Sequence, residues 1–81
     1  MTTDELCKLA GAITVTRGAV VLVNPSQVDI TLDGEVAGTF LWDEVDEGWY
    51  AQSAIWRRHL GAVNEIGDVF VVLGKILKSF R

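Results

Sequence analysis

The stretch that decides the fold is residues 28–51, VDITLDGEVAGTFLWDEVDEGWYA. Apolar and polar residues alternate in residues 28–32 and again in residues 36–42, with the period of a half-buried β-strand. The dipeptide Asp33-Gly34 between these two segments is typical of a tight hairpin turn. A third apolar segment follows an acidic turn. The stretch therefore predicts consecutive antiparallel strands.

The length of the loop at Asp33-Gly34 decides which side chains share a face of the sheet. A three-residue loop puts the next apolar residues on the face of Ile30; these are Val36, Phe40 and Trp42. A two-residue loop puts them on the opposite face, which a second partner would then have to cover. We favour the odd-numbered loop, because a small domain covers one apolar face more easily than two. The sequence leaves the register itself open.

The segments before this stretch predict a short helix and further strand. Thr2 and Glu5 have the spacing of a capping box, and Gly11 is placed to end the helix after two to three turns. Residues 12–23 are rich in β-branched side chains and predict a strand pair or one bent strand. Asn24-Pro25-Ser26-Gln27 has the residue preferences of a type I turn.

The C-terminal third predicts one more strand and a second helix. Residues 50–60 are compatible with either strand or helix, and residues 60–63 with a short closing strand. From Asn64, a candidate cap, to residue 80, apolar residues recur at intervals of three and four, which indicates an amphipathic helix. Its predicted core stripe is Ile66, Val69, Leu73, Ile76 and Phe80.

Together these segments predict one α+β domain spanning residues 1–81. Its core is an antiparallel β-meander of about four strands. A short N-terminal helix and the C-terminal amphipathic helix pack on one face of that meander.

The charge of the chain is unevenly distributed. The 81 residues carry a net charge of −4. Residues 18–56 hold seven acidic side chains and no Lys or Arg, whereas residues 57–81 hold five basic and two acidic side chains. Such an acidic stretch repels nucleic acid and attracts basic surfaces. The sequence therefore argues against nucleic-acid binding.

Three features favour a cytoplasmic protein. The single cysteine, Cys7, cannot form an internal disulfide. The N-terminal residues are too acidic and too poor in apolar residues for a secretory signal. No apolar run approaches the roughly 18 residues of a membrane span, so we expect no membrane partner.

The sequence argues against an enzyme. It contains no nucleophile–base pair at a recognisable spacing, no glycine-rich phosphate loop and no cluster of metal ligands. His59 has no second histidine or other ligand at motif spacing, and we interpret Arg57 and Arg58 as a solvated edge. We expect no cofactor and no metal.

The candidate binding site is the acidic turn with its flanking aromatic residues. Tyr and Trp are enriched at binding hot spots, and clustered carboxylates suit a basic partner protein. The predicted partner-binding residues are Trp42, Asp43, Glu44, Asp46, Glu47, Trp49 and Tyr50.

The succession GEVAGTF, GWYA and HLGAV, followed by an amphipathic helix, resembles short meander proteins of phages and mobile elements. The resemblance covers residues 34–80 and implies an accessory or inhibitory binding protein. An inhibitor or adaptor of this kind is the function that we predict.

An alternative is a structural homodimer or oligomer that assembles through the C-terminal helix. The apolar stripe of that helix is wider than one sheet face needs, and Gly67 would allow close approach of another backbone. The predicted interface residues are Val71, Val72 and Gly74.

Overall fold

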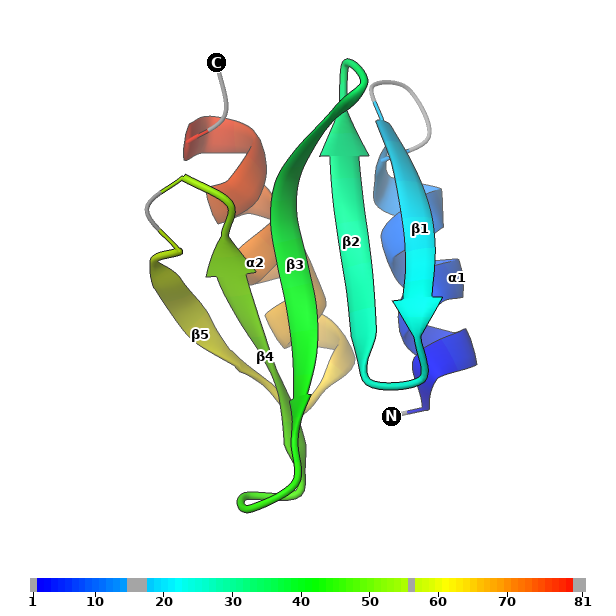
Figure 1. Ribbon diagram of the computed structural model, residues 1–81, viewed down its shortest axis with the longest axis vertical. Helices are drawn as coiled ribbons and strands as arrows, with labels where there is room; N and C mark the ends of the chain where they lie inside the picture. Colours follow the sequence, from blue (N-terminus) through cyan, green and yellow to red (C-terminus); the bar gives the residue numbers. More distant parts are fainter. Residues whose placement is uncertain (1, 15–17, 56, 80–81) are drawn as a thin grey trace.

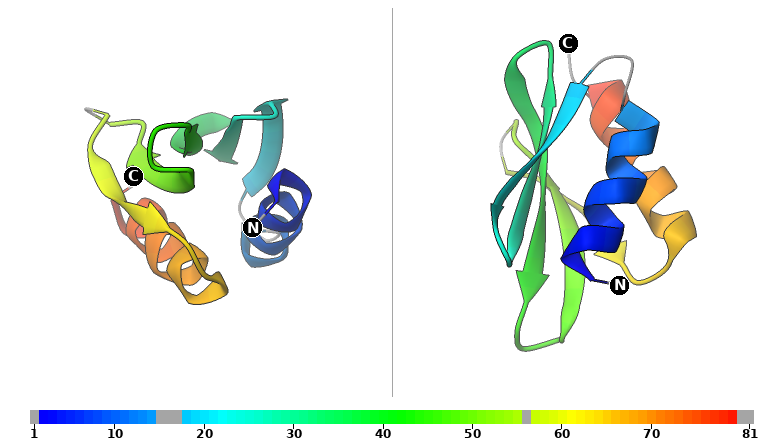
Figure 2. Two further views of the ribbon diagram at one scale, coloured as in Figure 1. Left: turned by 90° about the horizontal axis from the view of Figure 1, so that it is seen from below. Right: turned by 90° about the vertical axis from the view of Figure 1, so that its right-hand side faces the viewer.

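The computed structural model describes residues 2–14, 18–55 and 57–79. Their five antiparallel strands form one sheet in the order β1-β2-β3-β4-β5, and both helices lie on one face of it (Figures 1 and 2). The predicted α+β meander is confirmed, with five strands rather than about four. The elements in chain order are α1 (Thr3–Thr14), β1 (Gly18–Asn24), β2 (Gln27–Leu32), β3 (Glu35–Asp43), β4 (Gly48–Ser53), β5 (His59–Val63) and α2 (Ile66–Ser79).

Helix α1 begins at the predicted cap but is longer than predicted. The Glu5 amide donates to Thr2 Oγ1 at 3.2 Å, and the Thr2 hydroxyl donates to the Glu5 carboxylate at 3.1 Å. The helix then continues past Gly11 to Thr14, so the prediction that it ends at Gly11 is wrong. Burial of Leu6 and Ala10 against the core favours the helical continuation. Residues 12–14 are consequently helical, residues 15–17 lie outside the described chain, and the strand predicted over 12–23 begins only at residue 18.

The β1–β2 connection is the turn that the NPSQ segment predicts. The Ser26 amide donates to Asn24 Oδ1 at 2.8 Å, and Asn24 is paired with Gln27. The side-chain acceptor of Asn24 and the fixed φ of Pro25 both favour this turn.

The loop between β2 and β3 has two residues, so the expectation of an odd-numbered loop is wrong. Leu32 pairs directly with Glu35, and Asp33 and Gly34 have φ values of 53° and 84°. A turn with two positive φ angles matches the right-handed twist of the flanking strands. The dipeptide therefore forms the tight turn that it favours locally.

A β-bulge three residues after this loop shifts the pairing of β3 by one residue, so that its later side chains lie on the faces that a three-residue loop would have given them. Thr31 pairs with Val36 but Ile30 pairs with Gly38, which leaves Ala37 as the extra residue. Phe40 is thereby placed opposite Val28 on the helix-covered face, as predicted. Val36 precedes the bulge and stays on the other face, where its side chain is 44% exposed.

Two glycine substitutions should have opposite effects on stability. Gly34→Ala places a side chain in the left-handed region and should lower the free energy of unfolding by about 1–2 kcal/mol. Gly74→Ala lies on the exposed side of α2, with no atom within 4 Å of the added Cβ. It should raise the free energy of unfolding by about 0.5–1 kcal/mol. Urea unfolding measures both values, and destabilisation by Gly74→Ala would contradict the helical assignment at that position.

The ambiguous residues 50–60 form strand at both ends. β4 alternates buried and half-buried side chains, and Trp49, Ala51 and Ser53 face the helices. The chain then returns as β5, of which Val63 is buried in the core. Pairing on both sides of β4 explains why strand prevails over helix here.

Helix α2 is amphipathic, but its start and its stripe differ from the prediction. The Asp68 carboxylate accepts the amide protons of Asn64 and Glu65 at 3.0 and 3.1 Å, so the side chain that caps this end is Asp68 rather than Asn64. Ile66 is 61% exposed and does not belong to the core stripe. The core residues are Val69, Val72, Leu73 and Ile76. Phe80, predicted in the stripe, lies outside the described residues.

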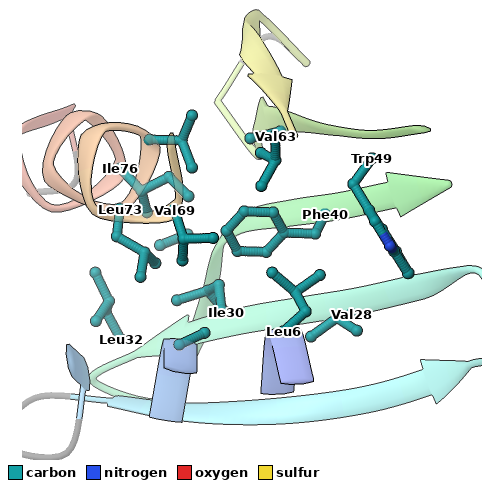
Figure 3. Close-up of a cluster of buried hydrophobic side chains, with 14 residues drawn as sticks. Leu6, Val28, Ile30, Leu32, Phe40, Trp49, Val63, Val69, Leu73 and Ile76 are labelled. Carbon is teal, nitrogen blue, oxygen red and sulfur yellow. The ribbon is translucent and has the colours of Figure 1, made fainter. Parts of the chain in front are cut away.

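The core lies between the sheet and the two helices, with Phe40 at its centre (Figure 3). Helix α2 packs closely on the sheet at Gly38, where an added Cβ would lie 2.6 Å from Cδ1 of Ile76. The opposite face of the sheet has no covering element among the described residues (Figure 2, left).

Candidate functional site

The hairpin between β3 and β4 projects beyond the rest of the sheet (Figure 1). Its exposed loop consists of Glu44, Val45, Asp46 and Glu47, which we call the acidic tip. Asp43 holds the loop, because its Oδ1 accepts the amide protons of Val45 at 2.9 Å and Asp46 at 3.3 Å. The three carboxylates of the acidic tip are consequently presented on an ordered turn.

Val45 is the most exposed large apolar side chain described, at 91%. It lies at the end of the hairpin with acidic residues on both sides in the chain. Val45 is not among the predicted binding residues, although an apolar residue inside an acidic turn was the available signal. An apolar group surrounded by charges is typical of the centre of a small contact patch.

The aromatic residues predicted to join this site lie in three different environments. Trp42 and Trp49 contact each other edge to face, with ring centroids 5.6 Å apart and an interplanar angle of 70°. Trp49 is 4% exposed and belongs to the core, whereas Trp42 is half-buried. Tyr50 points to the opposite face of the sheet, where its ring stacks on that of His59, with the ring centroids 5.7 Å apart. Trp42 and Tyr50 are both half-buried, and each lines a pocket with a residue of the acidic tip, Trp42 with Glu44 and Tyr50 with Asp46.

A shallow pocket of about 360 Å³ lies beside the acidic tip. Glu44, Trp42 and Trp49 form part of its lining, and the start of α1 and the β1–β2 turn form the rest through Thr2, Thr3, Pro25 and Ser26. The Thr3 hydroxyl donates to the Pro25 carbonyl at 2.9 Å, which joins these two segments. Sequence reasoning could not find this side of the site, because its residues are far apart in the chain.

Basic side chains gather at the other end of β4. A pocket of about 540 Å³ is lined by Ser53, Ile55, Arg58, His59, Leu60, Lys75 and Lys78. Lys75 Nζ donates to the Leu60 carbonyl at 3.0 Å, which ties α2 to β5. The charge asymmetry of the sequence is therefore also a spatial one, with the acidic tip and the basic pocket at opposite ends of one strand.

Helix α2 exposes an apolar face to solvent. Ile66, Phe70 and Val71 are 61%, 53% and 56% exposed, and no atom lies within 4 Å of the Cβ positions of Gly67 and Gly74. We call these five residues the α2 outer face. Val72, predicted at the interface, is 2% exposed and packs in the core. Val71 and Gly74 are available to a partner, and Val72 is not.

Cys7 is poorly suited to nucleophilic chemistry. Its thiol is half-buried on α1, and burial, with a smaller contribution from the Asp4 carboxylate, raises its pKa. A nucleophilic thiol requires a lowered pKa. Within residues 2–14, 18–55 and 57–79, no group of three or more His, Cys, Asp and Glu side chains could hold a metal ion.

The described helices are too short or too polar to cross a membrane. No protein-family model, no curated protein and no solved structure matches this chain.

Proposed function

We propose that this protein is a non-enzymatic protein-binding module that docks its acidic tip on a basic surface of a partner. The observation that carries the proposal is the projecting hairpin, on which Val45 is 91% exposed next to three exposed carboxylates. We take the cytoplasm as its compartment, on the basis of its single cysteine.

The acidic tip supplies both an apolar anchor and charge. Full burial of a valine side chain contributes about 1.5–3 kcal/mol, and half-buried Trp42 adds an aromatic surface of the kind that dominates binding energies. The carboxylates of Glu44, Asp46 and Glu47 attract a basic partner before contact and raise the association rate. Because the basic pocket lies at the other end of β4, the field of the molecule also orients this approach.

The mechanism of such a module is steric and electrostatic. A hairpin that covers a basic surface excludes whatever anionic ligand that surface normally binds, and this is how an inhibitor or adaptor acts without chemistry. Exposed charges are screened over about 8–10 Å at physiological salt. The association rate should therefore fall as the salt concentration rises.

Removal of the tip charges should weaken partner binding by about 3- to 150-fold. The variant is Glu44→Gln, Asp46→Asn and Glu47→Gln, which leaves Asp43 to hold the turn. Three exposed ion pairs contribute about 0.2–1 kcal/mol each, and 1.4 kcal/mol corresponds to a factor of ten. The immobilised protein is used to capture partners from cell lysate, and the affinity of a captured protein is then measured at low and high salt.

The matched control is Asp33→Asn with Glu35→Gln, which removes exposed charges at the β2–β3 turn. Asn-Gly is itself a favoured hairpin dipeptide, so the turn is retained. The control should capture the same protein as the wild type. Equal capture by the tip variant, or capture that does not depend on salt, would refute the proposal.

The α2 outer face supports a second candidate function, a homodimer or oligomer assembled through that helix. Exposed Ile66, Phe70 and Val71 lie along its surface together with two glycines that permit close approach of another helix. Val71→Asp should then give a monomer with an unchanged fold.

A further inference from the structure

Strand β1 has the sequence of an interior strand but lies at an edge of the sheet. Its residues, GAVVLVN, include no charged side chain. Apolar side chains occupy both of its faces, with Ala19 and Val21 on the open face and Val20 and Leu22 on the helix face, and Val23 lies at an irregularity between Leu22 and Asn24. A continuous apolar run is typical of a strand covered on both faces. Even so, Val21, Leu22 and Val23 are 45%, 54% and 48% exposed.

The other edge strand, β5, carries the protection that edge strands usually have. It is five residues long, and its pairing with β4 contains an irregularity. Gly61 has a φ of 146°, and Arg57 and Arg58 directly precede the strand. Short length, irregular backbone and flanking charge all discourage the addition of another strand. Strand β1 shares two of these features, an irregular pairing between Leu22 and Asn24 and a preceding arginine, Arg17. It differs from β5 in being seven residues long and in carrying three large apolar side chains that are 45–54% exposed.

Among the described residues β1 pairs with β2 and with no other strand. Figure 2, right, looks onto this edge and shows α1 beside the strand rather than in front of it. Every second residue of an edge strand directs its amide and carbonyl away from the sheet. The edge of β1 is thus open to another strand.

We propose that β1 pairs antiparallel with β1 of a second copy of this chain, across a two-fold axis at Val21. This register brings Val21 opposite Val21, Val20 opposite Leu22 and Ala19 opposite Val23. Val21 then meets Val21 on the open face, and Val20 meets Leu22 on the helix face. A two-fold contact needs this kind of self-complementary patch.

Charge favours a second copy as the occupant of this edge. The chain has a net charge of −4, so two copies repel each other at most approaches. Residues 18–28 contain no acidic or basic side chain. Edge-to-edge pairing of β1 therefore joins the two acidic molecules through their uncharged segment, and an antiparallel pair brings no like charges opposite each other.

The dimer is a continuous sheet with the helices of both copies on one side. Rotation about an axis perpendicular to the sheet reverses the strand direction, so the two acidic tips point to opposite ends of the dimer (Figure 1). The pairing does not depend on what the acidic tip binds. If both proposals hold, a partner with two basic sites gains avidity.

The first test is sedimentation equilibrium of the wild type and three variants from micromolar to submillimolar concentration. Val21→Lys places two lysines opposite each other at the two-fold axis and should raise the dimer dissociation constant by about tenfold or more. Val36→Lys is the matched control, since Val36 lies on the same open face and is 44% exposed, against 45% for Val21. It should dimerise like the wild type. A monomeric wild type, or equal effects of the two lysines, would overturn the proposal.

Val71→Asp separates this contact from the α2 outer face. A dimer that survives Val71→Asp and is lost in Val21→Lys forms through β1. The reverse pattern overturns the β1 proposal. Neither pattern involves the acidic tip, so failure here leaves the proposed function standing.

A cross-linking test in a Cys7→Ser background checks the register. A cysteine at residue 21 faces its own copy across the axis, at the separation that a disulfide needs. Val21→Cys should give a disulfide-linked dimer under mild oxidation, whereas Ala19→Cys, which faces residue 23, should not. Equal cross-linking of the two variants indicates random collision and would overturn the register.

Discussion

Val72→Asp is expected to unfold the domain, whereas Val71→Asp should leave it folded. Val72 is 2% exposed in the core, and its neighbour Val71 is 56% exposed on the α2 outer face. A carboxylate in an apolar core costs several kcal/mol, or else must take up a proton. A domain of this length has about 4–12 kcal/mol of total stability. Far-UV circular dichroism and urea titration at neutral pH measure the difference between the two variants.

The comparison tests the rotation of α2 about its axis, because the two residues are adjacent and chemically identical. Acidification should restore part of the structure of Val72→Asp, since protonation removes the buried charge. Two variants of equal stability would mean that the helix buries a different face. In that case Val72 would again become a candidate interface residue.

Phe40→Ala is expected to lower the free energy of unfolding by about 3–5 kcal/mol. The ring is fully buried at the centre of the core, between the sheet and α2 (Figure 3). For a domain of 60–100 residues, each kcal/mol shifts the melting temperature by about 4–8 °C. We therefore expect the transition to fall by at least about 12 °C in a thermal melt followed by circular dichroism.

The control for this substitution is Leu41→Ala, one residue further along β3. Leu41 is half-buried on the open face, so its truncation should cost clearly less than that of Phe40. The pair also tests the bulge at Ala37, since a register without the bulge would exchange the faces of the two residues. A larger loss for Leu41→Ala would show that β3 is paired differently.

The sequence by itself determined the features that depend on neighbouring residues. The capping box of Thr2 and Glu5, the turn at residues 24–27 and a hairpin turn at Asp33-Gly34 were predicted and are present, although the hairpin loop has two residues and not the odd number that we favoured. Each depends on local backbone preferences and on hydrogen bonds over two or three residues. Strand alternation and the 3–4 spacing of α2 likewise identified the elements of an α+β meander.

The tertiary structure decided how these elements meet. The bulge at Ala37 places Phe40 in the core, although the Asp33-Gly34 turn alone would place it on the open face. Pairing of β4 on both sides places Trp49 in the core and Tyr50, half-buried, on the other face.

The candidate site also combines features that depend on neighbouring residues with features that only the tertiary structure decided. Clustered acids between strands predicted the turn, and the exposure of Val45 at its end comes only from the way in which the hairpin projects. The position of β1 at an edge, with apolar side chains on both faces, is also a property of the assembled sheet. Periodicity specifies which residues of an element lie together. Whether a face of a helix or strand is covered depends on contacts between residues far apart in the chain. The free energy of those contacts depends on the packing of the whole structure.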